Sequence, residues 1–177
     1  MLRAKRPGKK ECYVPNHCEC DLYVDGPRKV VAEFYRHMGV NIGKFDLGAI
    51  VPYPAEYQAL DDEYAALGHY EWRKKYGAKP NGYNSGGYEW CCDVWGTKWG
   101  CYDVKRGKVN GRKCLHFKCA WNPPSEAIFA KMVKLFPGLV LRLEWFERGM
   151  GICGGQAWGD PDNSEPWRGA YNGIRGG

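Results

Sequence analysis

Alternating apolar and polar residues predict a series of short β-strands. The clearest run is 17–25, where every second residue is apolar, the pattern of a strand that buries one face and leaves the other open. Its apolar members are Cys18, Cys20, Leu22 and Val24. Further strands are expected at 45–51, 97–104, 114–121, 139–146 and 152–158. Asn110-Gly111 predicts a hairpin turn between the strands at 97–104 and 114–121.

Apolar residues at helical spacing predict two packed helices. Between Pro27 and Gly39, and again between Ser125 and Phe136, apolar residues recur every three or four positions and so share one helical face. They are Val30, Val31, Phe34, Tyr35 and Met38 in the first segment and Ile128, Phe129, Met132, Leu135 and Phe136 in the second. Pro137-Gly138 terminates the second helix.

Residues 55–76 show a weaker helical pattern, interrupted by Gly68, and 78–87 form a Gly-, Pro- and Asn-rich loop. We interpret 55–87 as an insertion. A short helical piece follows, and Gly96 then ends it as a C′ residue between Trp95 and Trp99. We expect this helix-to-strand corner to fill the core with its indoles. The alternative is a recognition edge formed by Lys98 and its neighbours.

The order of these elements predicts a split β-α-β arrangement: strand, helix, strand with insertion, hairpin, helix, strand. The expected class is α+β, an antiparallel sheet with two helices on one face plus a helical insertion. In this division residues 1–13 are a basic N-terminal extension. Residues 14–159 are the domain, with its insertion at about 55–95, and 160–177 are a poorly ordered C-terminal tail.

The formal net charge of +6 is unevenly distributed. Residues 1–13 hold five basic residues and one acidic residue, so +4 belongs to this arm and +2 to the rest of the chain. The arm either holds phosphates through counterion release or is solvated without a partner, and both interpretations stay open. No stretch approaches the roughly 18 apolar residues of a membrane span, and no secretion signal begins the chain. We therefore expect a cytoplasmic protein without a membrane partner.

Nine cysteines raise the questions of disulfides and zinc. The count is odd and the expected compartment keeps thiols reduced. The best zinc candidate is Cys12, His17, Cys18 and Cys20. Because His17 and Cys18 point to opposite faces of one strand, they cannot converge on one ion. We expect buried structural thiols, with no metal and no cofactor.

The residues give little support to an enzyme. His17 and His116 fall on the predicted open face of the sheet, where lone histidines are usually solvated. Gly149-Met150-Gly151 leads into a strand and not into a helix, so it is no phosphate-binding loop. Asp103 falls on the core-facing parity of its strand, where it needs a buried partner such as Thr97 or Lys98. We expect a binding protein with no catalytic residues.

The open face of the sheet is the predicted binding surface. Its aromatic residues would suit stacking of RNA or single-stranded DNA bases. Glu19, Asp21 and Asp25 on the same face would repel phosphates, so a protein partner is an equal alternative. The residues expected to touch the partner are Tyr23, Lys98, Tyr102, His116, Lys118, Arg142, Glu144 and Phe146.

Four ordered motifs carry a resemblance to a known family: Val14–Pro27, Trp95–Asp103, Ala120–Pro124 and Phe146–Gly151. In these segments the chain resembles the YubB-type ferredoxin-like proteins of bacteriophages and plasmids, over about 14–155 with a gap at 55–87. The resemblance implies a ferredoxin-like split β-α-β fold and an origin in a mobile genetic element. It implies no particular activity and no iron–sulfur cluster, and the cysteine spacings match no cluster motif.

Accessory proteins of mobile elements often counter host defence. The sharpest hypothesis is therefore a non-enzymatic protein in the host cytoplasm that inhibits a CRISPR or restriction nucleoprotein, with a host protein or nucleoprotein complex as its partner. This step follows from the resemblance and not from any single residue. The alternative is a module that binds RNA or single-stranded DNA through the open sheet face.

Overall fold

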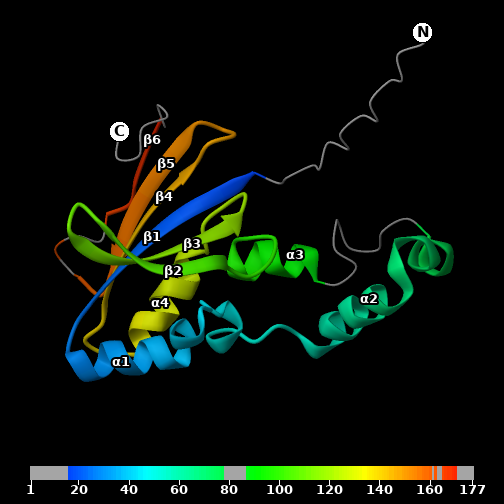
Figure 1. Cartoon of the computed structure of the whole chain (residues 1–177), viewed down its shortest axis with the longest axis horizontal. Helices are drawn as coiled ribbons and strands as arrows, with labels where there is room; N and C mark the ends of the chain where they lie inside the picture. The colour runs from blue at the N-terminus through cyan, green and yellow to red at the C-terminus, as the bar shows by residue number, and fades with distance from the viewer. Residues whose placement is uncertain (1–15, 78–86, 161, 163–164, 171–177) are drawn as a thin grey trace, which may run out of the picture.

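In the computed structural model, an antiparallel sheet forms the centre of the protein (Figure 1). The structure describes residues 16–77, 87–160, 162 and 165–170. Within these residues the sheet has six strands in the order β2-β3-β1-β4-β5-β6, and every neighbouring pair is antiparallel. The strands are β1 His17–Asp25, β2 Tyr102–Val109, β3 Arg112–Ala120, β4 Val140–Glu147, β5 Ile152–Trp158 and β6 Trp167–Ala170.

Two helices, α1 and α4, lie on the same side of the sheet, whereas α2 extends away from it (Figure 1). The α-helices are α1 Arg28–His37, α2 Ala55–Tyr76, α3 Tyr88–Trp90 and α4 Glu126–Leu135. Shorter elements are the 3-10 helices η1 Val40–Ile42 and η2 Leu47–Ala49 and the π-helix η3 Cys91–Trp95. None of the helices in the described ranges has the length and apolar composition needed to cross a bilayer. The α+β class and the antiparallel sheet are confirmed.

The core lies between the sheet and the two helices, and β1 runs through its middle. Cys20 pairs with Phe117 of β3 on one side and with Trp145 of β4 on the other. Phe117 stacks on Phe45 with ring centroids 4.8 Å apart, and Phe34 of α1 packs edge-on against Phe45 at 6.3 Å. Burying each such ring stabilises the fold by about 1.5–3 kcal/mol.

Residues 45–51, expected as a strand, form the 3-10 helix η2 instead. Asp46 accepts a hydrogen bond from the Gly48 backbone N–H at 2.8 Å, which turns the chain at that point. Phe45 and Leu47 remain buried on either side of Asp46. The alternation was therefore a sign of burial, while the local hydrogen bond of Asp46 decided the backbone conformation.

The strand expected at 97–104 begins only at Tyr102. Thr97 is buried and donates its hydroxyl proton to the Ala120 carbonyl oxygen at 3.0 Å, which holds this segment in an irregular path. The β2–β3 register then shifts between Tyr102 and Lys105, and Asp103 takes a φ of 53°. The strand alternation predicted that the Asp103 side chain faces the core, and this register shift turns it towards solvent instead. Its side chain is 54% exposed and pairs with Lys118 at 2.9 Å instead of meeting Thr97 or Lys98.

The unstructured tail expected at 160–177 is wrong for residues 167–170, which form β6 on the edge of β5. Two glycines in β5 make room for this strand. A Cβ atom at Gly155 would lie 2.6 Å from Nε1 of Trp167, and one at Gly154 would lie 2.7 Å from its carbonyl oxygen. Because β6 occupies this position, β5 is an inner strand and not the edge that was expected. Residues 161, 163–164 and 171–177 of the tail lie outside the described residues.

Helix α2 confirms the helical prediction for 55–76, including the interruption at Gly68. That residue has φ 73° and ψ 168°, so two helices meet at a kink. Trp72 is buried in the second part, between Tyr64 at 5.7 Å and Tyr76 at 4.3 Å between ring centroids. The loop expected at 78–87 lies outside the described residues except for Gly87, and the domain division stays a prediction.

The tryptophan corner fills the core with Trp95, as expected, whereas Trp99 is only half-buried and lies beside Lys98. Trp95 is buried and donates its indole N–H to the Val51 carbonyl oxygen at 3.0 Å. Gly96 follows with a φ of 80° and ends the π-helix η3. At this point the chain touches α4, because the Ser125 N–H donates to the Trp95 carbonyl oxygen at 2.8 Å.

We predict that Gly96→Ala destabilises the fold by about 2 kcal/mol or more, because alanine at positive φ is strained and its Cβ has no space. That Cβ would lie 2.6 Å from the Ser125 backbone nitrogen. Gly100→Ala is the matched control, since no atom lies within 4 Å of its added Cβ. Urea unfolding followed by circular dichroism measures both. Equal midpoints for the two variants would contradict the prediction.

Candidate binding surface on the sheet

The sheet surface opposite α1 and α4 carries most of the residues expected to touch a partner. Cross-strand neighbours point to the same side, so the register places them together. Asp21 lies between His116 of β3 and Glu144 of β4, and Tyr23 lies opposite Arg142. We call this surface the sheet face and define it by His17, Glu19, Asp21, Tyr23, Tyr102, Cys114, His116, Lys118, Arg142, Glu144 and Phe146.

Oppositely charged side chains alternate across the sheet face. Asp21 Oδ1 accepts from His116 Nδ1 at 2.8 Å, and Glu144 contacts Arg142 at 3.5 Å. Glu19 contacts Arg148 at 3.5 Å. The two arginine pairs lie at the surface and each contribute about 0–1 kcal/mol to stability, whereas Asp21 of the third pair is buried. The arginines offset the charges of Glu19 and Glu144.

The aromatic rings of the sheet face are covered. Tyr23 is 5% exposed and Phe146 7% exposed. The Arg112 guanidinium lies 4.7 Å from the Tyr23 ring centroid, and the Arg148 guanidinium lies 5.7 Å from that of Phe146. Burial, with the nearby carboxylates Glu144 and Asp21, raises the pKa of Tyr23 to about 12. The expectation that Tyr23 and Phe146 lie open for base stacking is therefore wrong.

Tyr102 is half-buried at the end of the sheet face where β2 begins. Its hydroxyl donates to the Cys119 carbonyl oxygen at 3.3 Å and is hydrogen-bonded to Nδ1 of His17. Burial raises the pKa of this phenol. His17 and Tyr102 thus hold each other in place, which leaves neither ring free to stack on a ligand.

Lys98 does not lie on the sheet face. It is only 5% exposed, and its Nζ atom lies 3.3 Å from the Trp121 ring centroid. The rings of Tyr88 and Trp99 are each 5.7 Å from the same nitrogen. The prediction failed because residues 97–101 are not a strand, so strand parity does not apply to them. Cation–π contact with these aromatic rings stabilises the charge of Lys98 at this depth.

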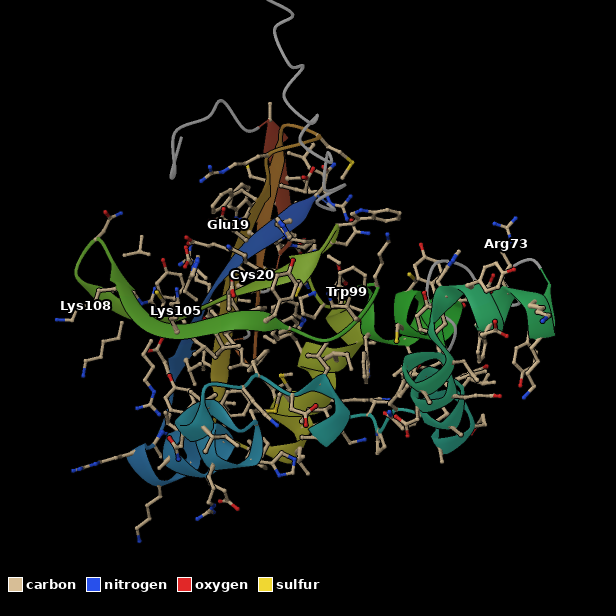
Figure 2. All side chains as sticks on the ribbon, turned by 45° about the vertical axis from the view of Figure 1, so that its right-hand side comes forward. Glu19, Cys20, Arg73, Trp99, Lys105 and Lys108 are labelled. Atoms are coloured by element: carbon tan, nitrogen blue, oxygen red, sulfur yellow. The ribbon has the colours of Figure 1, made fainter. Side chains whose placement is uncertain are left out.

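The strongest electrostatic feature is the β2–β3 hairpin, residues 102–120. It contains six basic residues and one acidic residue, a local balance of +5 in a chain of net +6. Arg106 is held by Asn41 Oδ1 at 2.6 Å and by the Tyr35 ring at 5.0 Å. Lys105, Lys108 and Lys113 are exposed. Figure 2 shows Lys105 and Lys108 on β2, far from Arg73 of α2.

The sequence analysis missed the positive charge of this hairpin because it summed the charges of all residues after the N-terminal arm, residues 1–13, into one total. A count per predicted element would have found it, since residues 14–101 hold nine basic and twelve acidic residues and so mask the hairpin in the total. β2 is also an edge strand of the described sheet, so its lysines protect that edge from pairing with another strand. Charge and position therefore make the hairpin the most exposed cationic element of the folded body.

Cys18, Cys20, Cys101 and Cys119 lie on the core side of the sheet, whereas Cys114 and Cys153 lie on the sheet face. Cys18 and Cys20 are fully buried, while His17 points to the opposite face and bonds Tyr102. His17 and Cys18 therefore diverge, as expected. Cys12 lies outside the described residues. In the ranges that the structure describes, no group of three or more His, Cys, Asp or Glu side chains has the geometry to hold a metal ion.

Comparisons with known proteins add little. No family model matches the chain, and no curated protein matches it. A similar solved structure is the crystal structure of protein api92 from Yersinia pseudotuberculosis, which carries the family model DUF1281. The two chains are 11% identical, with a TM-score of 0.49 over 92% of this chain and 100% of the other. A likeness of this degree carries no functional information.

We predict that Lys118→Met raises the pKa of Asp103. Lys118 lowers the pKa of that carboxyl by a hydrogen bond and by its charge, and Lys105 adds a smaller effect. Because the pKa of Asp103 is lower in the folded state than in the unfolded state, its ionised carboxylate stabilises the fold at pH values above the ordinary pKa. This stabilisation is lost as the pH falls through the lowered pKa of the folded state. Carboxyl chemical shifts recorded against pH measure the change. Lys105→Met is the control and should produce a smaller rise; equal rises would contradict the assignment.

Proposed function

We propose that this protein is a non-enzymatic binding protein whose β2–β3 hairpin contacts the phosphate backbone of a nucleic acid. The observation that carries the proposal is the +5 balance of residues 102–120. Exposed lysines at the edge of a sheet bind phosphates by releasing condensed counterions, and this attraction needs no base contact. Glu19 and Glu144 of the sheet face are paired with arginines, which weakens their opposition to a phosphate chain.

Binding of this kind is sequence-independent. Phosphate contacts position a nucleic acid, whereas base contacts specify its sequence. The rings of Tyr23 and Phe146 are covered, so base stacking supplies little of the binding energy. His116 and Lys118 belong to the hairpin itself, and like Arg142 of β4 each contacts a carboxylate, so the sheet face adds no net positive charge to that of the hairpin.

The polar contacts of the sheet face agree with binding and not with catalysis. A nucleophilic cysteine needs its thiol hydrogen-bonded to a base that takes its proton. Cys114 instead contacts Oδ1 of Asp21 at 3.9 Å, and the same oxygen is already ion-paired with His116. The carboxylate therefore stands between the thiol and the imidazole, which is the wrong order for a Cys-His pair.

We further propose that the central elements form a ferredoxin-like split β-α-β fold of the YubB type, from a mobile genetic element. The order β2-β3-β1-β4, with α1 after β1 and α4 after β3, supports this assignment. In this view β5 and β6 extend the sheet on one edge, and α2 with α3 forms the insertion before β2. The family assignment implies an origin in a mobile genetic element but no particular biochemical activity.

A second candidate is an inhibitor of a host defence nucleoprotein in the host cytoplasm. The alternating ion pairs of the sheet face favour it, because a mixed-sign surface selects a partner with complementary charges and rejects others. The cationic hairpin would then compete for the nucleic-acid site of the nucleoprotein. This candidate shares the binding surface of the first and differs in the identity of the partner.

We predict that Lys105→Gln/Lys108→Gln weakens binding to single-stranded DNA and lowers the slope of log affinity against log salt by about 1.4, since each lost phosphate contact on a single strand removes about 0.7. Fluorescence anisotropy of a labelled oligonucleotide over a potassium chloride series measures both. Lys131→Gln/Lys134→Gln on α4 removes the same charge from the helix layer and should leave the slope nearly unchanged. Equal losses in both variants, or no binding by the unaltered protein, would refute the hairpin assignment.

For the second candidate, we predict that the protein retains a nucleoprotein from a bacterial lysate with an active CRISPR or restriction system after nuclease treatment. Arg142→Glu on the sheet face should abolish retention. Lys131→Glu makes the same charge change on α4 and should retain the partner. If nuclease removes everything that the unaltered protein captures, the partner is a nucleic acid and the inhibitor candidate fails.

A further inference from the structure

Four thiols meet on the core side of the sheet, where the chain enters β2. Cys18 of β1 lies directly opposite Cys119 of β3. Cys101 precedes Tyr102, whose register partner is Lys118, so Cys101 faces Cys119 from the other side. The sulfurs of Cys101 and Cys119 are 3.5 Å apart. Cys20 completes the group, and its thiol contacts Cys119 and Cys18.

The sulfurs of Cys101 and Cys119 already lie near each other, although Cys101 stands just outside the β2–β3 pairing. A disulfide holds its two sulfurs about 2.05 Å apart. The sulfurs must move together by about 1.5 Å to reach bonding distance. Rotation of the two side chains supplies such a shift without moving either strand.

We propose that Cys101 and Cys119 are a modification site at which a peroxide oxidises the two thiols to a disulfide. Cys101 is partly exposed and lies at the irregular segment before β2, so a small oxidant reaches the pair from that side. Cys119 is fully buried next to it. The site is separate from the sheet face, and the inference does not depend on the proposed function.

The electrostatics of the cluster favour a reactive sulfur at Cys119. Burial raises the pKa of its thiol, but hydrogen bonds with Cys101, Cys20 and Thr97 outweigh burial and lower the pKa below its ordinary value. Burial instead raises the pKa values of Cys101 and Cys20. Within this group, the hydrogen bonds therefore make Cys119 the thiol that ionises most easily, with the Cys101 thiol beside it.

The reaction balances with hydrogen peroxide as the oxidant. The Cys119 thiolate attacks one peroxide oxygen, so that an S–O bond forms, the O–O bond breaks and hydroxide leaves. The Cys101 sulfur then attacks the sulfur of the sulfenic acid, so that the S–S bond forms and water leaves with the Cys101 proton. The proton released when Cys119 ionised neutralises the hydroxide. Two thiols are oxidised and one peroxide is reduced to two waters.

The bond would tie the entrance of β2 to the end of β3. Residues 96–101 have no regular strand pairing, and hydrogen bonds such as that from Thr97 to Ala120 hold them in place. A disulfide at Cys101 would fix this segment covalently at the base of the basic hairpin. It would also consume the thiol group from which Cys119 receives its hydrogen bond.

The test is peptide mapping of the reduced full-length protein after treatment with hydrogen peroxide and alkylation in denaturant. Trypsin places Cys101 alone in peptide 99–105 and Cys119 alone in peptide 119–131, while Cys18 and Cys20 share peptide 11–28. We expect peptides 99–105 and 119–131 to be linked, and seven of the nine cysteines to remain alkylated. A dominant link between 11–28 and 119–131, or no link at all, would overturn the proposal.

Two variants and one condition control the experiment. Cys101→Ser should remove the link, and because this residue is only partly buried, circular dichroism should show that the variant still folds. Cys153→Ser, at a partly buried thiol of β5 that contacts the Gly169 carbonyl oxygen at 3.6 Å, should keep the link. Peroxide treatment in urea should reduce the link to background. A link that forms equally well in urea would show that the fold does not create the site.

Discussion

The structure depends on the two-sided pairing of β1. This strand bonds to β3 on one edge and to β4 on the other, and its core-side residues Cys18, Cys20 and Leu22 are fully buried. A register shift of one residue would turn these three into the sheet face and bury Asp21 and Glu19 under the helices. That exchange would place unpaired carboxylates in an apolar core, which costs several kcal/mol for each charge. The burial of β1 therefore determines which residues form the sheet face.

With the two faces defined, the charges of the protein separate along its elements. On the sheet face, Asp21 of β1 contacts His116 of β3, Glu144 contacts Arg142 of the same strand β4, and Glu19 contacts Arg148 just beyond β4, so a basic group lies beside each of these carboxylates. The excess of positive charge lies on the hairpin at the edge, where solvent surrounds the lysines. The net positive charge of the described residues therefore lies at the edge of the sheet and not across its middle.

The sequence predicted the parts of the fold that burial alone determines. The alternation of 17–25 and the helical spacing after Pro27 and Ser125 led to the observed strand and helices. The failures occurred where a single polar contact redirected the backbone. Asp46 capped a 3-10 turn, and the buried Thr97 held an irregular segment. For the surface, strand alternation placed Tyr23 and Arg142 correctly on one face of the sheet, but it carries no information on whether Arg112 covers the Tyr23 ring.

Positive φ angles occur at both ends of the hairpin and at its turn. Among the described residues other than glycine, those with positive φ are Asp103, Asn110 and Trp121, which lie at its entrance, its turn and its exit. Asn110 has a local reason, because Asn-Gly turns need this conformation. Asp103 lies at the register shift between Tyr102 and Lys105, where a bulge in the strand pairing allows a positive φ. At Trp121 a positive φ costs of order 1–3 kcal/mol unless the surroundings compensate. The compensation at Trp121 includes Lys98 over its ring, and at Asp103 it is the pair with Lys118. These contacts hold the two ends of the hairpin in place.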